Sequence, residues 1–420
     1  MKLLHTADWH LGRRLEGKSR HDEQVAVLKE ICAIAESEDV DGVLVTGDIY
    51  DSYNPPAESE ALFYTTAARL SDGGRRAVVV IAGNHDGPDR LRASDPYARA
   101  LGIVTLGYPH DVAEPFDGGA GRVACLTSAP PYLRLRLRSG EHLSILALPY
   151  PSEARLRQVL SDRIGDAEAA ESYDVAVRNL LASGVGDIAE AEACVAISHL
   201  FVCGGRESES ERTIQGSEAS IAIEDGVVVP LHVGGAYAVE PRSFPMRAGY
   251  VALGHLHRPQ EFVGYGGPPI RYAGSPLAYS FSEAGQRKSV TIVEFEGPIA
   301  THRAVDLESG RTLIDKKGLR GLDELNAFLD AAPPDAWLAV AVELDAALPV
   351  GAIEEICRRH RGILRHIFHY AQESGDTPRE PIAGLPIDEQ FRRFVRERGE
   401  EPSPELIELF MEIASEGSRE

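Results

Sequence analysis

The sequence predicts an α/β protein whose first domain is built from layers of strands and helices. Apolar strands are expected at residues 2–6, 43–45 and 78–81. Helical periodicity separates them, at residues 22–37 and in a helix that opens near Pro55 and Pro56. Strands that alternate with helices favour βαβ units, so we expect a layered α/β domain. Further strands are expected at 143–148, 193–198 and 250–253, the first in a hairpin with the arginine-rich segment 134–138.

Length and composition exclude several classes of protein. The 420 residues suggest two or three domains at about 150 residues each. No stretch approaches the roughly 20 apolar residues of a membrane span, and the N-terminal apolar stretch is too short for a secretion signal. The five cysteines form no C-x-x-C pair. We therefore exclude a membrane protein, a secreted protein, a disulfide framework and a zinc knuckle, and expect a reducing cytoplasm.

The charge balance is strongly acidic. There are 43 lysines and arginines against 65 aspartates and glutamates, a net charge of −22. Proteins that bind nucleic acid by bulk electrostatics are basic, so this balance counts against that kind of binding. Net charge does not describe a single groove, however, and carboxylates can be neutralised by bound metal ions.

The pattern changes near residue 285. Strands are expected at 290–295, 302–307, 337–344 and 364–369, with helices at 323–330 and 353–359. This β-β-α-β-α-β unit predicts a small α+β domain over residues 286–373, after a first domain over residues 1–285. Residues 374–385 read as a linker. Two short amphipathic helices, at 388–397 and 404–414, are expected in the last segment, 386–420.

Aspartate, asparagine and histidine gather where the predicted strands end. They are Asp8, His10, Asp48, Asn84, His85, His199, His255 and His257. Open α/β sheets bind ligands at the carboxyl ends of their strands. A site for two divalent metals needs several oxygen and imidazole ligands and one carboxylate that bridges both ions. Each motif alone has an ordinary explanation, such as a helix cap or a turn. Their conjunction in this order predicts a two-metal site.

These motifs resemble those of the calcineurin-like metallophosphoesterases. The segments are HTADWHLG, VTGDIYDSYNPP, IAGNHD, AISHLF and YVALGHLHRPQ, followed by YAGSPLAYSFSE. The flanking residues make the chain similar to the SbcD family of bacterial DNA-repair nuclease subunits. The resemblance covers residues 1 to about 285 strongly. It implies a layered β-sandwich flanked by helices, the metallophosphoesterase fold, with a small capping domain and C-terminal helices.

The resemblance also implies roles for the strand-end residues. One metal would be held by Asp8, His10, Asp48 and His257, and the other by Asp48, Asn84, His199 and His255, with Asp48 bridging. His85 would act near the leaving group without binding metal. Mn²⁺ is the expected ion, with Mg²⁺, Fe and Zn²⁺ as alternatives. Some relatives carry a further histidine near the position of Asp51, and none lies between Asp48 and His85 here.

The activity implied by the resemblance is that of a metal-dependent DNA nuclease. It would be a 3′→5′ exonuclease and an endonuclease on ends or hairpins, working with an SbcC-type ATPase subunit. We expect no ATP site in this chain, and a homodimer within a heterotetramer. The alternatives are a metallophosphodiesterase or phosphatase acting on a small nucleotide, and a scaffold that keeps the fold without the chemistry.

Two further groups of residues are candidates for binding larger partners. A DNA backbone could be held by a basic cluster just after His10, namely Arg13, Arg14, Lys18 and Arg20. The alternative is a solvated loop. The ATPase subunit could be gripped by apolar residues of the C-terminal helices, namely Phe391, Phe394, Leu406, Leu409 and Phe410. The alternative is that these residues pack on the protein itself.

Overall fold

The computed structural model describes residues 1–152, 155, 166–211, 221–224, 227–230, 232–233, 236–262, 265–349, 351–370, 387–397, 402–404, 406–407 and 409–411. The chain divides into two units. The first comprises Met1–Glu343 with Leu348–His369, and the second comprises Leu344–Ala347 with Tyr370–Glu420. Within the described residues, no helix is both long enough and apolar enough to cross a membrane.

The first unit contains a six-stranded sheet in the order β20-β19-β1-β4-β5-β6. Its parallel part is formed by β1 (Lys2–Thr6), β4 (Gly42–Thr46), β5 (Ala77–Ile81) and β6 (Ile103–Leu106). β19 (Ser289–Glu296) pairs antiparallel with β1, and β20 (Ile299–Asp306) pairs antiparallel with β19. The three strands predicted in the first hundred residues are confirmed.

A second sheet has eight strands in the order β17-β18-β16-β11-β10-β9-β8-β7. At its centre, β10 (His142–Leu148), β11 (Ala193–His199), β16 (Tyr250–Gly254) and β18 (Ile270–Tyr272) run parallel. The other strands are β7 (Phe116–Asp117), β8 (Ala124–Ala129), β9 (Tyr132–Arg136) and β17 (Gln260–Phe262). β9 and β10 form the predicted hairpin.

The two sheets pack face to face over a shared apolar core. Leu44 of the first sheet and Val195 of the second belong to this core. Their neighbours Val43 and Cys194 point the opposite way, into the outer cores. Successive side chains of a strand alternate between its faces, and here both faces are buried. That is why these strands are continuous apolar runs rather than alternating ones.

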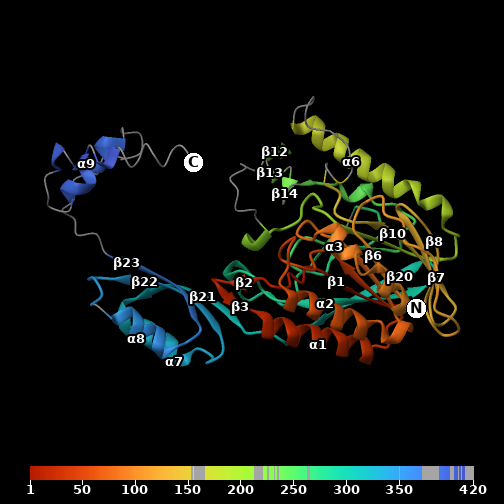
Figure 1. Ribbon diagram of the computed structural model, residues 1–420, viewed down its shortest axis with the longest axis horizontal. Coiled ribbons are helices and arrows are strands. Elements are labelled where there is room, and N and C mark those ends of the chain that lie inside the picture. Colours follow the sequence, from red (N-terminus) through yellow and green to blue (C-terminus); the bar gives the residue numbers. More distant parts are fainter. Residues whose placement is uncertain are drawn as a thin grey trace. The chain divides into compact units, whose positions relative to one another are not determined.

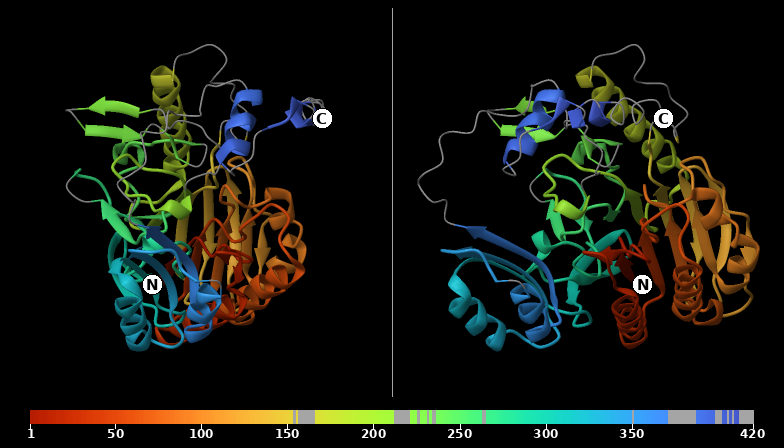
Figure 2. Two further views of the ribbon diagram at one scale, coloured as in Figure 1. Left: turned by 90° about the vertical axis from the view of Figure 1, so that its left-hand side faces the viewer. Right: turned by 60° about the vertical axis from the view of Figure 1, so that its left-hand side comes forward.

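Helices cover both outer faces of the sandwich. α1 (His21–Ser37) and α2 (Ala57–Leu70) pack on the first sheet, where they lie side by side (Figure 1). α6 (Asp166–Ser183) packs on the second sheet (Figure 2). The expected helix-flanked sandwich is confirmed. The remaining short elements are β2 (Arg14–Leu15), β3 (Lys18–Ser19), α3 (Pro88–Arg92), α4 (Asp95–Ala98), β12 (Ile221–Glu224), β13 (Val227–Pro230), β14 (His232–Val233) and β15 (Ala236–Tyr237).

A three-stranded sheet of β21 (Leu313–Arg320), β22 (Trp337–Leu344) and β23 (Ile363–Tyr370) follows, with α7 (Gly321–Ala331) and α8 (Ala352–Arg359). The predicted strands 290–295 and 302–307 are not part of it, because they are β19 and β20 of the first sheet. The predicted boundary at residue 286 therefore cuts through that sheet. A strand's residue pattern shows that it is buried but not which sheet it joins, and β21 was not predicted.

The last segment contains α9 (Ile387–Glu397), in agreement with the predicted helix at 388–397. The described residues between 404 and 411 are also helical, as predicted. The predicted linker, 374–385, lies outside the described residues. The division into a nuclease domain, a capping domain and a partner-binding segment otherwise stays a prediction.

Candidate metal centre

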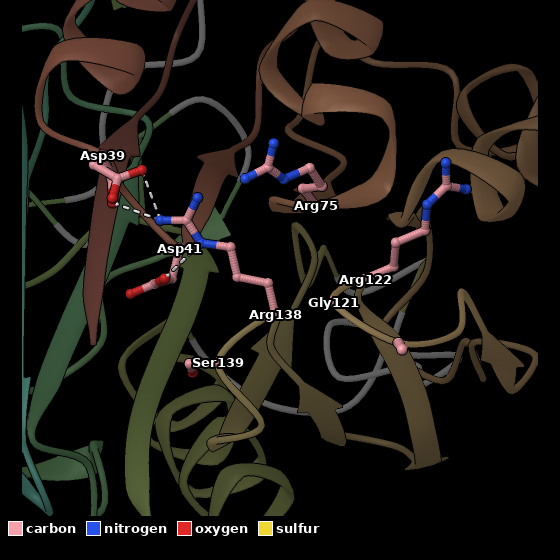
Figure 3. Close-up of a pocket in the computed structure, with 8 residues that line it drawn as sticks. Asp39, Asp41, Arg75, Gly121, Arg122, Arg138 and Ser139 are labelled. Carbon is pink, nitrogen blue, oxygen red and sulfur yellow. Dashed lines mark hydrogen bonds and ion pairs between the residues drawn. The ribbon is translucent and has the colours of Figure 1, made fainter.

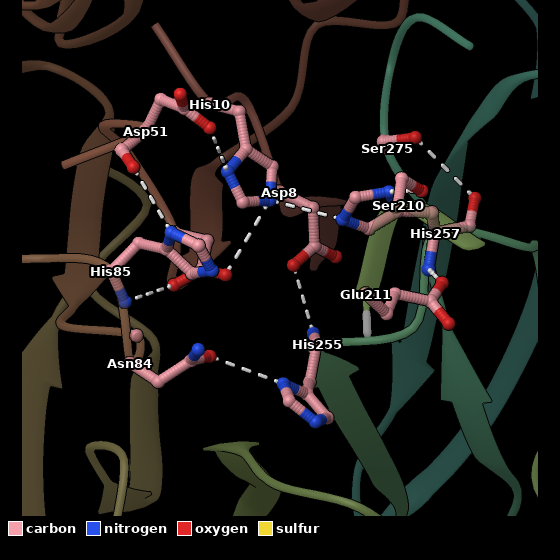
Figure 4. A network of polar contacts seen from close by, with 12 residues as sticks. Asp8, His10, Asp51, Asn84, His85, Ser210, Glu211, His255, His257 and Ser275 are labelled. Atoms are coloured by element: carbon pink, nitrogen blue, oxygen red, sulfur yellow. Dashed lines mark hydrogen bonds and ion pairs between the residues drawn. The ribbon is translucent and has the colours of Figure 1, made fainter. Parts of the chain in front are cut away.

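All the predicted strand-end residues meet at one edge of the sandwich. Asp8 and His10 follow β1, Asp48 follows β4, and Asn84 and His85 follow β5. His199 ends β11, and His255 and His257 follow β16. Backbone hydrogen bonds join neighbouring loops, since the Asp8 amide donates to the Gly47 carbonyl at 3.0 Å and the His10 amide to the Asp48 carbonyl at 2.9 Å. Figure 4 shows six of these side chains converging, namely Asp8, His10, Asn84, His85, His255 and His257.

Among the described residues, three groups of side chains have potential ligand atoms within 4.8 Å of one another. One contains Asp8, His10 and His257, and a second contains Asp8, Asp48 and His199. The third contains His10, Asp51 and His85. Asp51 was not predicted as a ligand, although the sequence signal was present directly after the GDIY segment.

On one side of the centre, two imidazoles face each other. His10 Nε2 lies 3.0 Å from His257 Nε2 and 3.4 Å from an Asp48 carboxylate oxygen. Two neutral rings that both present a lone pair at this separation repel each other unless a proton or a cation lies between them. Imidazole nitrogens at about 2.1 Å from a common metal ion would be at a comparable separation.

On the other side, Asn84 lies between two histidines. Asn84 Oδ1 is 3.0 Å from His199 Nε2 and 3.2 Å from His255 Nδ1. His199 Nε2 is also 3.5 Å from Asp48 Oδ2, the same oxygen that faces His10. One carboxylate oxygen is therefore shared between the two sides of the centre.

Buried polar atoms without partners show that the residues fit metal ions. Within the described part of the chain, Asp8 Oδ2, His10 Nδ1 and His255 Nε2 are buried and have no hydrogen-bond partner. Leaving such atoms unsatisfied is costly, and most buried polar groups have a partner. Carboxylate oxygens and imidazole nitrogens with free lone pairs are ligands for Mn²⁺, Fe or Zn²⁺. The donor set thus suits divalent metal binding.

The backbone of the site is in an uncommon conformation. Asp8, His10, Asp48 and His255 have φ values of 54°, 42°, 49° and 106°. Non-glycine residues rarely adopt such values, and they concentrate at functional sites because the surrounding structure must hold them. The space is also tight, since a Cβ on Gly83 would lie 2.0 Å from Asp48 Oδ1. Only glycine therefore fits beside the shared carboxylate.

The charges of the site are strongly coupled. Burial raises the pKa of Asp8 well above its usual range. Burial opposes the charged form of Asp48, but His199 and His85 hold the pKa of Asp48 well below its usual range. Burial likewise opposes protonation of His199, yet the Asp48 carboxylate raises the pKa of His199 to about 9. Burial and His199 lower the pKa of His255 to about 3. A metal that binds His199 through Nε2 must displace a proton.

Supporting residues hold the loops of the site together. Asp86 accepts hydrogen bonds from the amides of Gly83, Tyr50 and Ile49, at 2.8, 2.9 and 3.2 Å, which joins the two loops. Arg155 donates to the Gly83 carbonyl at 2.7 Å and to the Asp86 carbonyl at 2.9 Å. The motif GNHD contained Asp86 as a signal, but nothing in the sequence pointed to Arg155.

His85 is attached to the site through its neighbours. Its amide donates to Asp48 Oδ1 at 2.9 Å, and its Nδ1 lies 3.0 Å from the Asp51 carbonyl. A carbonyl only accepts, so Nδ1 carries a hydrogen, and Nε2 is the ring nitrogen left to exchange a proton with another group. The ring is partly exposed, with its centroid 4.9 Å from that of His10. His85 can therefore meet a group that arrives from solvent.

The four residues of the predicted basic cluster differ in their exposure to solvent. Arg14 and Lys18 are exposed. Arg13 is ion-paired with Asp51 at 3.2 Å and donates to the Ser210 carbonyl at 2.8 Å. Arg20 is 1% exposed, and its guanidinium donates twice to Glu23 and once to the Ala278 carbonyl. Because Arg20 is buried and paired, it has a structural role and cannot reach a DNA backbone.

The basic face of the β9–β10 hairpin is neutralised by carboxylates. Arg134 pairs with Glu192 at 2.8 Å, and Arg136 pairs with Asp117 at 2.6 Å. Arg138, just beyond β9, pairs with Asp39 and Asp41 in a hollow also lined by Arg75 and Arg122 (Figure 3). Paired guanidiniums offer little net charge to a phosphate backbone, so this face gives no support to DNA binding.

Residues 12–19, GRRLEGKS, match the G-x-x-x-x-G-K-S spacing of a phosphate-binding loop. The expectation that this chain has no ATP site overlooked this match. That loop requires a strand, a glycine-rich turn and a helix that starts at the lysine. Here β2 and β3 pair as a hairpin, with Glu16 and Gly17 at its turn and φ values of 46° and 76°. The spacing therefore lacks the structural context of an ATP site.

The C-terminal candidate residues differ in exposure. The rings of Phe391 and Phe410 are stacked, with centroids 3.9 Å apart. Leu406 is 40% exposed and Leu409 is 54% exposed. The backbone of Phe394 lies in α9, and its side chain is not among the described ones.

Comparisons with known proteins agree with this geometry. The calcineurin-like phosphoesterase family model matches residues 1–152. The chain is 39% identical to the SbcD subunit of the SbcCD nuclease of Bacillus subtilis (strain 168) over 419 residues, which cover 99% of this chain and 98% of the relative. It is 35% identical to the corresponding SbcCD nuclease subunit of Rhodobacter capsulatus, over 80% of this chain and 77% of that protein.

A solved dimetal phosphatase from Danio rerio covers 73% of this chain and 96% of its own, at 12% identity and a TM-score of 0.37, too low to carry a conclusion. The two SbcCD nuclease subunits are similar enough to show the family of this chain. The chain belongs to the SbcD family of nuclease subunits, within the calcineurin-like metallophosphoesterases, and is a metal-dependent phosphodiesterase.

Proposed function

We propose that the chain cleaves phosphodiester bonds of DNA at a centre that holds two Mn²⁺ ions. The observation that carries this proposal is the position of Asp48. One of its carboxylate oxygens lies 3.4 Å from His10 Nε2 and 3.5 Å from His199 Nε2. A two-metal centre needs one carboxylate that reaches both ions.

The proposed ligands form two sets that share Asp48. The first set adds Asp8, His10 and His257, and the second adds Asn84, His199 and His255. The unpartnered Asp8 Oδ2 and the approach of His10 Nε2 to His257 Nε2, 3.0 Å apart, support the first set. The approach of Asn84 Oδ1 to His199 Nε2 and His255 Nδ1 supports the second. Asp51 is a further candidate at the rim, because its carboxylate is 3.5 Å from His10 Nδ1.

The chemistry divides between the ions and the protein. Divalent ions held there would lower the pKa of a bound water and neutralise phosphoryl oxygens. The protein holds the ligand carboxylates and imidazoles at buried positions. The leaving sugar oxygen needs a proton or a positive partner, and a protonated His85 ring would supply either through Nε2. The tether from the His85 amide to Asp48 places that ring at the rim of the centre.

The DNA backbone would be held without readout of its sequence. Arg14 and Lys18 are the exposed cations of the proposed cluster, on the hairpin that follows His10. Contacts to phosphates orient DNA but do not read its bases. Preference for 3′ ends and hairpins stays a prediction from the resemblance.

An ATPase subunit is the proposed protein partner. Both curated relatives are named as subunits of an SbcCD nuclease. The exposed leucines of the last segment, Leu406 and Leu409, support a role of that segment in assembly. A homodimer with two partner chains and a location in the cytoplasm stay predictions from the sequence.

Cleavage assays on two substrates test the proposal. End-labelled duplex and hairpin DNA would be incubated with Mn²⁺ and with wild type, His85→Ala or His110→Ala, since His110 is exposed and outside the site. We expect His85→Ala to lose turnover by about 10²-fold or more, as for loss of a general acid, and His110→Ala to match wild type. Full turnover by His85→Ala would refute its role. Cleavage of a chromogenic small diester with DNA left intact, even after addition of the ATPase subunit, would favour a small-nucleotide phosphodiesterase.

A further inference from the structure

His257 is held by residues from loops that the metal motifs do not include. Its ring is buried, and its Nδ1 lies 2.7 Å from the hydroxyl of Ser210. The same hydroxyl lies 2.6 Å from Glu283 Oε1. Ser210 is in the short turn Glu209–Glu211, and Glu283 ends the turn Phe281–Glu283. Both side chains are buried, at 9% and 0% exposure.

The direction of these hydrogen bonds follows from the number of available hydrogens. Lys288 Nζ lies 2.5 Å from Glu283 Oε2, so an ammonium holds the carboxyl group in its ionised form. An ionised carboxylate only accepts, and a serine hydroxyl has one hydrogen to donate. Ser210 must therefore donate to Glu283. It can then only accept from His257, which places the hydrogen of the His257 ring on Nδ1.

We propose that Ser210 and Glu283 are positioning residues that fix the tautomer of His257, so that its Nε2 lone pair faces the metal centre. His257 Nε2 is the atom that lies 3.0 Å from His10 Nε2. The inference rests on the proposed role of His257 as a ligand. Polar groups behind a metal-binding imidazole orient the ring and raise its basicity.

The backbone of His257 is fixed by the same group of residues. Glu211 accepts from the His257 amide, and Lys288 Nζ donates to the His257 carbonyl at 2.9 Å. By contrast, the Nδ1 of His199 faces a backbone carbonyl, that of Thr46, at 2.8 Å. A mutation can remove a side chain but not a carbonyl, so of these two tautomers only that of His257 can be released by a single substitution.

The tautomer can be read directly, without any cleavage assay. Full-length, metal-free protein with ¹⁵N-labelled histidine would be measured by NMR at pH 8, and His257→Gln would assign the signal. We expect a protonated Nδ1 and an unprotonated Nε2 in wild type. A protonated Nε2, or a mixture of tautomers, would overturn the inference. This reading needs no variant of Ser210 or Glu283 to fold.

Metal affinity then separates a positioning role from a structural one. We expect Ser210→Ala to weaken binding of one Mn²⁺ ion about 10-fold to 100-fold and to leave the other unchanged. Ser208→Ala is the matched control, since Ser208 lies in the same segment and is buried to 6% exposure. Wild-type affinity in Ser210→Ala would overturn the inference.

Glu283→Gln gives the opposite hydrogen-bond direction. The amide would turn its oxygen to Lys288 and its NH₂ to Ser210, so Ser210 would donate to His257 and the ring hydrogen would move to Nε2. We expect this variant to bind the ion less tightly than Ser210→Ala does. If NMR showed the same His257 tautomer in this variant as in wild type, the proposed role of the Glu283–Ser210 hydrogen bond would be contradicted. If the wild-type protein bound no Mn²⁺, the proposed function would fail. If the wild-type protein bound two ions and Ser210→Ala bound them with the same affinity, only this inference would be refuted.

Discussion

The two sheets supply the metal centre in different ways. The first sheet contributes Asp8, His10, Asp48, Asn84 and His85 from loops that directly follow three neighbouring parallel strands, and backbone hydrogen bonds join those loops. The second sheet contributes His199, His255 and His257, which reach the centre only because the sheets pack together. The first half of the site is thus a local property of one sheet, while the second depends on long-range packing and on supporting side chains.

Space beside the ligands is a constraint in both halves, since a Cβ on Gly83 would lie 2.0 Å from Asp48 Oδ1 and a Cβ on Gly254 would lie 1.9 Å from the Thr46 carbonyl oxygen. In the second half, the orientation of the rings is a further constraint, and Ser210 or a backbone carbonyl provides it. Substitutions in the two halves should therefore fail in different ways.

The largest effect is expected at Asp48, the residue that the two proposed ligand sets share. Asp48→Asn keeps the shape of the side chain but removes its charge, and we expect both ions to be lost and DNA cleavage to fall by at least about 10²-fold to 10³-fold, as when a preorganised electrostatic contact is removed. Metal content and cleavage rate measure this. Asp117→Asn, at the surface, is the control. Retention of both ions by Asp48→Asn would show that the two ligand sets do not share this carboxylate.

Removal of a ligand that belongs to only one of the two ligand sets should abolish binding of one ion. We expect His257→Ala to bind a single Mn²⁺ per chain, because the second set of ligands does not include His257. Isothermal titration calorimetry would count the ions. Loss of both ions with the fold retained, as judged by circular dichroism, would show that the two ligand sets cannot bind metal independently.

Crowding the first half should disturb the centre without removing a ligand. In Gly83→Ala the new Cβ would lie 2.0 Å from Asp48 Oδ1, so the loop must shift. We expect a loss of about 1–3 kcal/mol in the free energy of unfolding, as for other overpacked sites, together with weaker metal binding. Denaturant unfolding measures the first. Gly186→Ala, where a Cβ would meet no atom within 4 Å, should match wild type. Equal stability of the two variants would contradict the steric argument.

Acid should weaken metal binding through the second half. The pKa of His199 is about 9 without metal, so below that pH the ion must displace its proton. We expect the affinity for one ion to fall about tenfold for each pH unit between pH 8 and pH 6 from this group alone. His255, whose pKa is about 3, adds nothing in this range. Calorimetry in buffers of different ionisation enthalpy would count the released proton, and an affinity independent of pH would be inconsistent with that pKa.

The first half of the site could be predicted from the sequence because its signal is local. Asp8, Asp48 and Asn84 each follow an apolar strand, and parallel strands bring their carboxyl ends to one edge. His199, His255 and His257 were predictable by the same rule, with the family resemblance joining them to the first set. The layered fold followed from the alternation of strands and helices.

Other features depend on contacts that no local pattern records. Ser210 and Glu283 lie 47 and 26 residues from His257, in turns without periodicity. β19 and β20 carry an ordinary strand pattern, and only their pairing with β1 places them in the first sheet. Arg20 stands in a basic stretch, and its burial against Glu23 follows from packing rather than from composition.

Anomalous diffraction would show whether one carboxylate contacts both ions. Crystals of the wild-type protein would be grown with Mn²⁺ and measured near the manganese absorption edge. We expect two anomalous peaks per chain, each at about 2.1 Å from an oxygen of Asp48, the usual length of a metal–carboxylate bond. A single peak, or two peaks of which only one contacts Asp48, would contradict the proposed two-metal centre.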